Sequence, residues 1–157
     1  MCQQKKNKDS NQAQRSGDFM RQKWRIYGLS DKNGDVPGLG HGFVDVFDTH
    51  GHFIKRLVTQ GQLDSPWGLA LAGGSFGKFS NDLLAGNFGN GYINAFAPTT
   101  GAFLGHLTDQ KGNPIIIDGL WSLLFGLGGQ AGMANQLFFT AGIRQEADGL
   151  FGMIQAM

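Results

Sequence analysis

The chain is poor in several features that commonly stabilise proteins or direct them to a compartment. It has a single cysteine among 157 residues, Cys2, which excludes an intrachain disulfide and any metal site built from several cysteines. Charged residues make up 16% of the chain, below the average of ~25%. There is no run of 18 apolar residues, so no membrane-spanning helix is predicted, and the first residues lack the apolar core of a signal peptide.

Glycine and aromatic residues are abundant instead. Glycine contributes 26 residues, well above the usual ~7%, and is accompanied by 13 phenylalanines and 3 tryptophans. This apolar content argues against a disordered, low-complexity chain. Glycines that separate short apolar runs are typical of tight turns between short strands, so the composition favours an all-β fold.

The net charge of +1 conceals a basic head and an acidic body. The first 25 residues carry seven basic side chains against two acidic ones, a net charge of +5; the rest carries six basic and ten acidic ones, a net charge of −4. Such a head is either an arm for nucleic acid or a membrane surface, or a solvated leader. No aromatic residues alternate with the basic ones. We therefore predict that residues 1–24 are a disordered leader and that the chain has no nucleic-acid partner.

Two pairs of segments reveal an internal repeat of about 50 residues. Residues 66–86, "PWGLALAGGSFGKFSNDLLAG", align without a gap with residues 120–140, "LWSLLFGLGGQAGMANQLFFT". Residues 42–57 align with residues 91–107 when one extra residue is allowed in the hairpin of the second segment. The identical pairs are Trp67 with Trp121, Leu69 with Leu123, Gly74 with Gly128, Asn81 with Asn135, Leu83 with Leu137, Phe47 with Phe96, Gly51 with Gly101, Phe53 with Phe103, and Leu57 with Leu107.

Each repeat is expected to contain four short strands. In the central one these are "WGLALA", "DLLAGNF", "GYINAFA" and "AFLGHLT", separated by glycine-rich and Pro-Thr-Thr-Gly turns. Four strands about every 50 residues are typical of a β-propeller blade. We predict a partial β-propeller over residues 25–157, with blades at approximately 25–59, 64–109 and 118–157, about two and a half blades in all.

A closed propeller has 4–8 blades, more than this chain supplies. An open stack leaves unpaired strand edges and an uncovered apolar blade face. We therefore expect the chain to be a truncated fragment whose partners are the missing blades, with self-association into a ring as the alternative.

From about Tyr27 onward, the sequence resembles the C-terminal half of an uncharacterised family of bacterial propeller-like proteins, some of which end in a PEP-CTERM sorting signal. The segments that carry the resemblance are "GHGFVDVFDTHG", "SPWGLALAGGSFGKFSNDLLAGNFGNGYINAFAPTTGAFLGHL", "GNPIIIDGLWSLLFG" and "LFFTAGIRQEADGLFG". The "PWGLAL" to "INAF" portion is also similar to NHL-type blades. The resemblance implies a propeller that is secreted or displayed at the cell surface, with further blades upstream. It implies no reaction.

Two glycine-rich segments imitate catalytic motifs. Gly126, Gly128 and Ala131 follow the spacing of a dinucleotide-binding loop, and Glu146 lies where a ribose-binding acid would be. That site needs a helix after the loop, whereas a short β-favouring run, "QLFFT", follows. The G-x-S-x-G pattern at residues 73–77 requires a strand-to-helix turn, but the sequence predicts a hairpin. Both segments are interpreted as turns.

Two further motifs suggest metal ligands. His50 and His52 offer two imidazoles at a hairpin tip with no third ligand nearby, so solvated turn histidines are expected. Residues 31–35, "DKNGD", imitate the start of an EF-hand loop, but Val36 and Gly42 occupy the positions of its glycine and glutamate. No cofactor is predicted; calcium or zinc is the open alternative.

Acidic residues near strand ends are the remaining candidates. Asp64 precedes Trp67, and Asp118 precedes Trp121, at the same offset of 54 residues. If these runs are innermost strands, the acids lie at one mouth of a central channel, where propellers bind ligands. The alternative is that the acids cap turns and the tryptophans are core. The candidate ligand-binding residues are Asp64, Trp67, Asp118, Trp121, Glu146 and Asp148.

These features favour a non-catalytic binding or scaffold module, and the resemblance implies a location outside the cytoplasm. The alternative is a propeller hydrolase of the lactonase or esterase class, with a divalent metal held at the channel mouth by acids such as Asp64 and Asp118. No dense cluster of histidines and acids supports the alternative.

Overall fold

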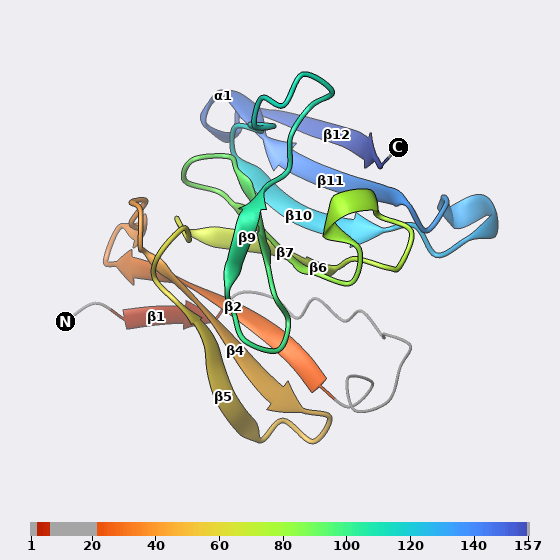
Figure 1. The fold of residues 1–157 in the computed structure, drawn as a ribbon. Coiled ribbons are helices and arrows are strands. Elements are labelled where there is room, and N and C mark those ends of the chain that lie inside the picture. The colour runs from red at the N-terminus through yellow and green to blue at the C-terminus, as the bar shows by residue number, and fades with distance from the viewer. Residues whose placement is uncertain (1–2, 7–21, 157) are drawn as a thin grey trace.

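The computed structural model describes residues 3–6 and 22–156. These residues form an all-β fold of three antiparallel sheets (Figure 1). The N-terminal sheet has the strand order β1-β2-β4-β5, with β3 beside β2. Its strands are β1 (Gln3–Lys6), β2 (Gln22–Asp31), β3 (Gly34–Asp35), β4 (Gly42–Asp48) and β5 (Phe53–Thr59).

The central sheet has the order β6-β7-β8-β9, and the C-terminal sheet has the order β10-β11-β12. Tight turns connect neighbouring strands, as the glycine content predicts. The strands are β6 (Pro66–Leu71), β7 (Leu83–Asn87), β8 (Ile93–Phe96), β9 (Phe103–His106), β10 (Leu120–Phe125), β11 (Gln136–Gly142) and β12 (Asp148–Gln155).

Among the described residues, three short helical turns lie in the hairpin connections. The 3-10 turns η2 (Gly77–Phe79) and η3 (Gly129–Ala131) lie in the β6–β7 and β10–β11 connections. The turn α1 (Ile143–Glu146) connects β11 to β12 through three residues with positive φ, Arg144, Gln145 and Glu146. The glycine motifs at 73–77 and 126–131 therefore lie in equivalent hairpins, in agreement with their interpretation as turns.

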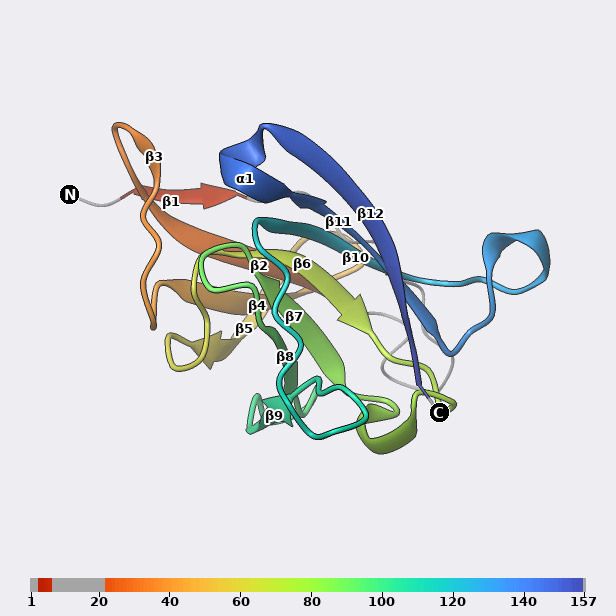
Figure 2. The same ribbon diagram turned by 90° about the horizontal axis from the view of Figure 1, so that it is seen from above.

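The central sheet is buried on both faces. One face packs on the N-terminal sheet through a core that includes Trp24, Val44, Leu69 and Phe96. The other face packs on the C-terminal sheet through a second core; its buried members include Ala70, Leu84, Ile93, Ala95, Leu120, Leu123 and Leu137. Both views show the central sheet between the other two (Figures 1 and 2). Burial of alternate residues on opposite faces follows from the two-residue period of a strand.

Glycine allows β10 to approach β6 and β7 closely, through Gly68 of β6 and Gly86 of β7. A Cβ atom on Gly68 would lie 2.9 Å from Cγ of Leu123, and one on Gly86 would lie 2.6 Å from Cδ2 of Leu120. Since such distances are far inside van der Waals contact, only glycine permits this approach.

The pairing extends the repeat to the third strand of each sheet. Leu83 and Leu137 are equivalent in the sequence alignment; Leu83 pairs with Phe96, and Leu137 pairs with Ile154. Strand β12 is therefore the counterpart of β8, and Ile154 is the counterpart of Phe96. In the N-terminal sheet, β4 and β5 correspond to β8 and β9, which makes β2 and β1 the counterparts of β7 and β6.

The sequence expectation differs from the structure in two details. Within the segment 1–24 expected to be a leader, residues 3–6 form β1 and β2 begins at Gln22, whereas residues 1–2 and 7–21 lie outside the described part. The two-residue strand β3 was not expected. The described residues form three stacked sheets, and the all-β prediction is confirmed; they do not themselves close into a ring.

Candidate functional site

The predicted site residues divide into two groups, and Trp67 and Asp64 form the first, at the junction of the N-terminal and central sheets. The indole nitrogen of Trp67 donates a hydrogen bond of 2.7 Å to Oδ2 of Asp35. Its ring stacks on Phe88 with the centroids 5.1 Å apart. The half-buried tryptophan thus combines an apolar contact with a satisfied N–H.

Asp64 is a buried carboxylate that connects three loops. It is 7% exposed, and its Oδ1 accepts a hydrogen bond of 2.7 Å from the amide of Gly38. Its backbone carbonyl accepts another, of 3.1 Å, from the amide of Gly89. These contacts are those of a residue that holds turns together, and they occupy one of the carboxylate oxygens.

The second group lies at the same end of the C-terminal sheet. The indole nitrogen of Trp121 donates to Oε1 of Glu146 over 3.0 Å, and Oδ2 of Asp118 accepts a hydrogen bond of 3.3 Å from the Arg144 amide. The Arg144 guanidinium forms an ion pair with Asp148. The positive-φ turn α1 brings these residues together, although they are up to 30 positions apart in the sequence.

The turn between β7 and β8 lies between the two groups. Gly89 of this turn bonds to the Asp64 carbonyl, and the carbonyl of Gly91 accepts the amide of Ile117, which precedes Asp118. The residues that the structure describes include no group of three histidine, cysteine or acidic side chains with the arrangement of a metal site. The binding role of the six candidate residues stays a prediction.

The histidine motif at the β4–β5 hairpin is organised by Asp48. Its Oδ1 accepts the amides of His52 and His50, each at 2.8 Å, and its Oδ2 lies 2.8 Å from Nδ1 of His52. The hydrogen bond from the His52 amide is the main reason that the pKa of Asp48 lies below its ordinary value. The imidazoles are therefore parts of an exposed turn with one nearby carboxylate.

The loop that imitates a calcium site is a tight hairpin between β2 and β3. Asp31 accepts the Asn33 amide over 2.7 Å, a local turn contact, and Asp35 accepts the Trp67 indole. The two acids thus have protein partners in different directions. Calcium or zinc binding by this chain stays an untested alternative.

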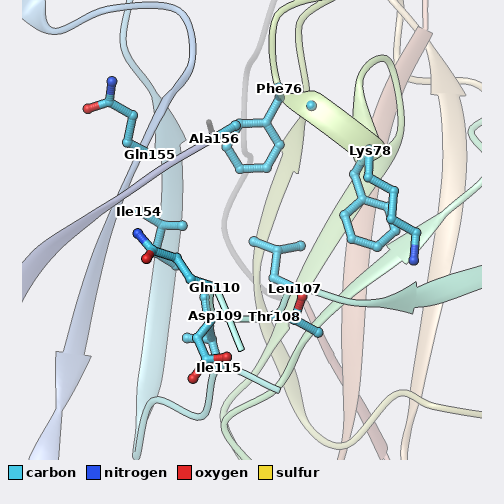
Figure 3. Close-up of a pocket in the computed structure, with 12 residues that line it drawn as sticks. Phe76, Lys78, Leu107, Thr108, Asp109, Gln110, Ile115, Ile154, Gln155 and Ala156 are labelled. Carbon is cyan, nitrogen blue, oxygen red and sulfur yellow. The ribbon is translucent and has the colours of Figure 1, made fainter. Parts of the chain in front are cut away.

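A pocket that the sequence does not reveal opens between the central and C-terminal sheets. It has a volume of about 390 Å³ and is bordered by η2, the end of β9 and the end of β12. Leu107 and Ile154 lie on opposite sides of it (Figure 3). Its apolar lining residues are Phe76, Phe79, Leu107, Ile115, Ile154 and Ala156. It lies beyond the ends of β6 and β12, whereas Asp64 and Asp148 lie near the starts of these strands.

The outward face of the C-terminal sheet exposes several large apolar side chains. Leu124 is 50% exposed, Phe151 69% and Met153 45%. Phe138 stacks on Phe151 with ring centroids 5.8 Å apart and planes 9° from parallel. We call these four residues the apolar face. An apolar face of this kind on a sheet commonly marks an interaction surface.

No helix among the described residues has the length and apolar character needed to cross a membrane. No protein-family model matches the chain.

Similar proteins come from a giant virus. An uncharacterized protein of Acanthamoeba polyphaga mimivirus is 36% identical over 132 residues, which cover 82% of this chain and 32% of the relative. A second mimivirus protein is 32% identical over 76% of this chain and 30% of its own length. A third is 34% identical over 55% of this chain and 16% of its own length. The chain thus spans about a third or less of the length of the curated relatives it matches.

These relatives overturn the resemblance to a bacterial propeller family, which is wrong: the matching proteins are viral. The short glycine-separated apolar strands that suggested that family are a general consequence of a repeated antiparallel sheet, so they do not distinguish one source from another. The chain is similar to a segment of larger mimivirus proteins.

Proposed function

We propose that the chain is a non-catalytic binding or scaffold module of propeller type, and that its apolar face receives a further four-stranded sheet of the same repeat. One observation carries the proposal. The counterparts of Leu124, Phe138, Phe151 and Met153 in the central sheet are Ala70, Leu84, Ile93 and Ala95. All four counterparts are buried against the next sheet along the chain.

The stacking of the described sheets supports a repeat sheet as the occupant. The N-terminal sheet covers one face of the central sheet and the C-terminal sheet covers the other, each through a continuous apolar core. The viral relatives are about three times as long as the matched segment, which is sufficient for further sheets. Burial of exposed apolar area provides the driving force, at roughly 25 cal/mol per Å².

The inner end of the apolar face differs from the central sheet. The positions of Gly68 and Gly86 are taken by Ser122 and Thr140, whose hydroxyl oxygens are 2.7 Å apart. These side chains prevent an inner strand from approaching as closely as β10 approaches β6. A covering sheet is therefore expected to contact mainly the outer part of the face, around Phe138 and Phe151.

Light scattering of the purified chain tests this proposal. We expect concentration-dependent association, because a second copy offers the same apolar face when the natural sheet is missing, and we expect Leu124→Lys to abolish it. Leu127→Lys is the matched control, since Leu127 is 81% exposed in the β10–β11 connection, outside the apolar face. A wild-type chain that stays monomeric up to its solubility limit would contradict the proposal.

The hydrolase alternative stays a prediction for Asp64 and Asp118. Both carboxylates accept backbone amides, from Gly38 and Arg144 respectively. Among the described residues, no observation indicates that Asp64 or Asp118 binds a substrate or a metal.

A further inference from the structure

Strand β12 has one paired edge and one edge that no strand of the described residues pairs. Strand β11 lies on one side of it, whereas the equivalent strand of the central sheet, β8, lies between β7 and β9 (Figure 1). At eight residues, β12 is also twice as long as β8. A long open edge of this kind is a ready template for another extended chain.

The hydrogen bonds show which backbone groups lie at this edge. The amide of Ala156 donates to the carbonyl of Asn135, on the β11 side, over 3.2 Å. Because successive residues of a strand direct their backbone groups to opposite sides, those of Phe151, Met153 and Gln155 point away from β11. The open edge therefore offers three amides and three carbonyls.

The central sheet shows how the same groups are used when a fourth strand is present. The counterparts of Phe151 and Gln155 are Ile93 and Ala97. The carbonyl of Ile93 accepts the amide of Leu107, and the amide of Ala97 donates to the carbonyl of Ala102, over 3.0 and 2.9 Å. In the central sheet, the β9 segment thus forms hydrogen bonds with the backbone groups whose counterparts in β12 face the open edge.

The side chains of the fourth strand follow one pattern in both complete sheets. Phe53 of β5 contacts Phe47, and Phe103 of β9 contacts Phe96, each with ring centroids 5.7 Å apart. A buried leucine follows four residues later, Leu57 in the first case and Leu107 in the second. The shared pattern is Phe-x-x-x-Leu.

The pocket lies where the phenylalanine of such a strand would enter. The counterpart of Phe96 is Ile154, which packs toward the central sheet and lines the pocket. Since directly opposed residues of an antiparallel pair share a face, a residue opposite Ile154 points into the same space. The pocket of about 390 Å³, with Phe76 and Leu107 in its wall, accommodates a benzyl group.

We propose that the open edge of β12 and the adjoining pocket bind, in trans, an extended segment with the Phe-x-x-x-Leu pattern, which completes the C-terminal sheet as its fourth strand. The segment runs antiparallel to β12, bonds to the backbone of Phe151, Met153 and Gln155, and places its phenylalanine in the pocket. The leucine then adds to the apolar face beside Phe151. This proposal rests on the proposed function as a binding module, and it names the chemistry of a partner.

A peptide with the chain's own fourth-strand sequence is the probe. A fluorescent peptide of residues 100–109, "TGAFLGHLTD", is titrated with the full chain, and its anisotropy is measured. We expect saturable binding, and a peptide with alanine at the phenylalanine position is expected to bind at least about tenfold more weakly because it leaves the pocket empty. Equal binding of the two peptides would overturn the assignment of the pocket.

Proline at the open edge tests the backbone contacts. Met153→Pro removes an amide that points away from β11. We therefore expect it to prevent peptide binding while the hydrogen bonds between β11 and β12 are kept. Met153→Ala keeps the amide and is the matched control. Amide exchange of the wild-type chain provides a second measurement. The amides of Phe151, Met153 and Gln155 should gain protection on peptide binding, and no gain would overturn the proposal even if the proline variant fails to fold.

Two variants separate this proposal from the proposed function. Phe76→Ala opens the pocket wall and should weaken the peptide without changing self-association, whereas Leu124→Lys should abolish self-association and leave the peptide bound. Peptide binding that fails while association persists overturns only the edge proposal. A dimer that Met153→Pro dissociates and Met153→Ala does not, with no peptide binding, would show that a second copy occupies the edge and would also overturn it.

Discussion

The two outer faces of the stack are built from different chemistry. On the N-terminal sheet, Asp45 is 5% exposed and receives two hydrogen bonds from Arg56, of 2.8 and 3.1 Å. The guanidinium of Arg56 lies over the Phe43 ring at 4.3 Å, and that of Arg25 over the Phe47 ring at 5.3 Å. On the C-terminal sheet, the corresponding outer surface is the apolar face.

The two ends of the stack of sheets therefore differ in polarity. Arginines that cover aromatic rings and pair with a carboxylate satisfy the outer surface of the N-terminal sheet. The apolar face has no such cover among the described residues, and its large side chains are exposed there. One end of the stack therefore resembles a finished surface and the other resembles the buried face of the central sheet.

The largest expected effect contrasts the two faces of the C-terminal sheet itself. Leu137 is fully buried against the central sheet, and Leu124 on the opposite face is half exposed. We expect Leu137→Ala to lower the free energy of unfolding by about 2–5 kcal/mol and Leu124→Ala to lower it by less than about 1 kcal/mol. Chemical denaturation of both variants measures the difference. Equal losses would show that the apolar face is buried in solution.

The ion pair of the N-terminal sheet should have an intermediate effect. Asp45→Ala leaves the Arg56 guanidinium without its carboxylate and is expected to cost about 1–2 kcal/mol, toward the lower end because Arg56 is partly exposed. A double-mutant cycle with Arg56→Ala isolates the coupling between the two side chains. Additive losses in that cycle would mean that Asp45 acts through other contacts.

Acid should weaken two turns first, the one at Asp48 between β4 and β5 and the one at Asp109 after β9. Hydrogen bonds, chiefly from the His52 amide to Asp48 and from the Asn113 side chain to Asp109, lower the pKa values of these carboxyls. A lowered pKa contributes stability that is present above the unfolded value of about 4 and is lost as the pH falls through the folded value.

Amide exchange as a function of pH measures this order. We expect the turns at Asp48 and Asp109 to lose protection first below about pH 4, and Asp48→Asn to remove part of the pH dependence in β4 and β5. The wild-type chain at the same pH values is the control. If the strands of all three sheets lose protection together at every pH, the sheets unfold as one unit and the predicted order is wrong.

The smallest expected effect concerns a link across the first interface. Nζ of Lys55, on the exposed side of β5, donates to the carbonyl of Thr99 in the β8–β9 turn over 2.6 Å. Because exposed polar contacts contribute little, Lys55→Ala should change the free energy of unfolding by less than about 0.5 kcal/mol. Thermal unfolding with and without added salt measures it; a larger loss would assign this link a structural role in stacking.

Much of the fold follows from short-range patterns in the sequence. The alternation in "GYINAFA" and the glycine-rich turns predict the β7–β8–β9 meander, and the match of residues 66–86 with 120–140 predicts that η2 and η3 occupy equivalent hairpins. Strand β1 was not predicted, because its polar residues carry no apolar period and its pairing with β2 is a long-range contact.

The candidate sites were less predictable than the strands. The offset of 54 placed Asp64 and Asp118 at equivalent positions just before β6 and β10, but it did not show that backbone amides of Gly38 and Arg144 bond to them. The pocket and the open edge depend on how two sheets stack and on which residues of β12 point outward. Neither property has a sequence signature of its own.

The sequence by itself determined the all-β class, the repeat and the positions of the turns, because these depend on the two-residue strand period and on glycine's backbone freedom. Only the tertiary structure decided which faces are covered. The same apolar alternation occurs in β8 and β12, yet Ile93 is buried and Phe151 is 69% exposed. The residues of a strand determine which of its sides is apolar. Whether that side is buried depends on whether another sheet packs against it.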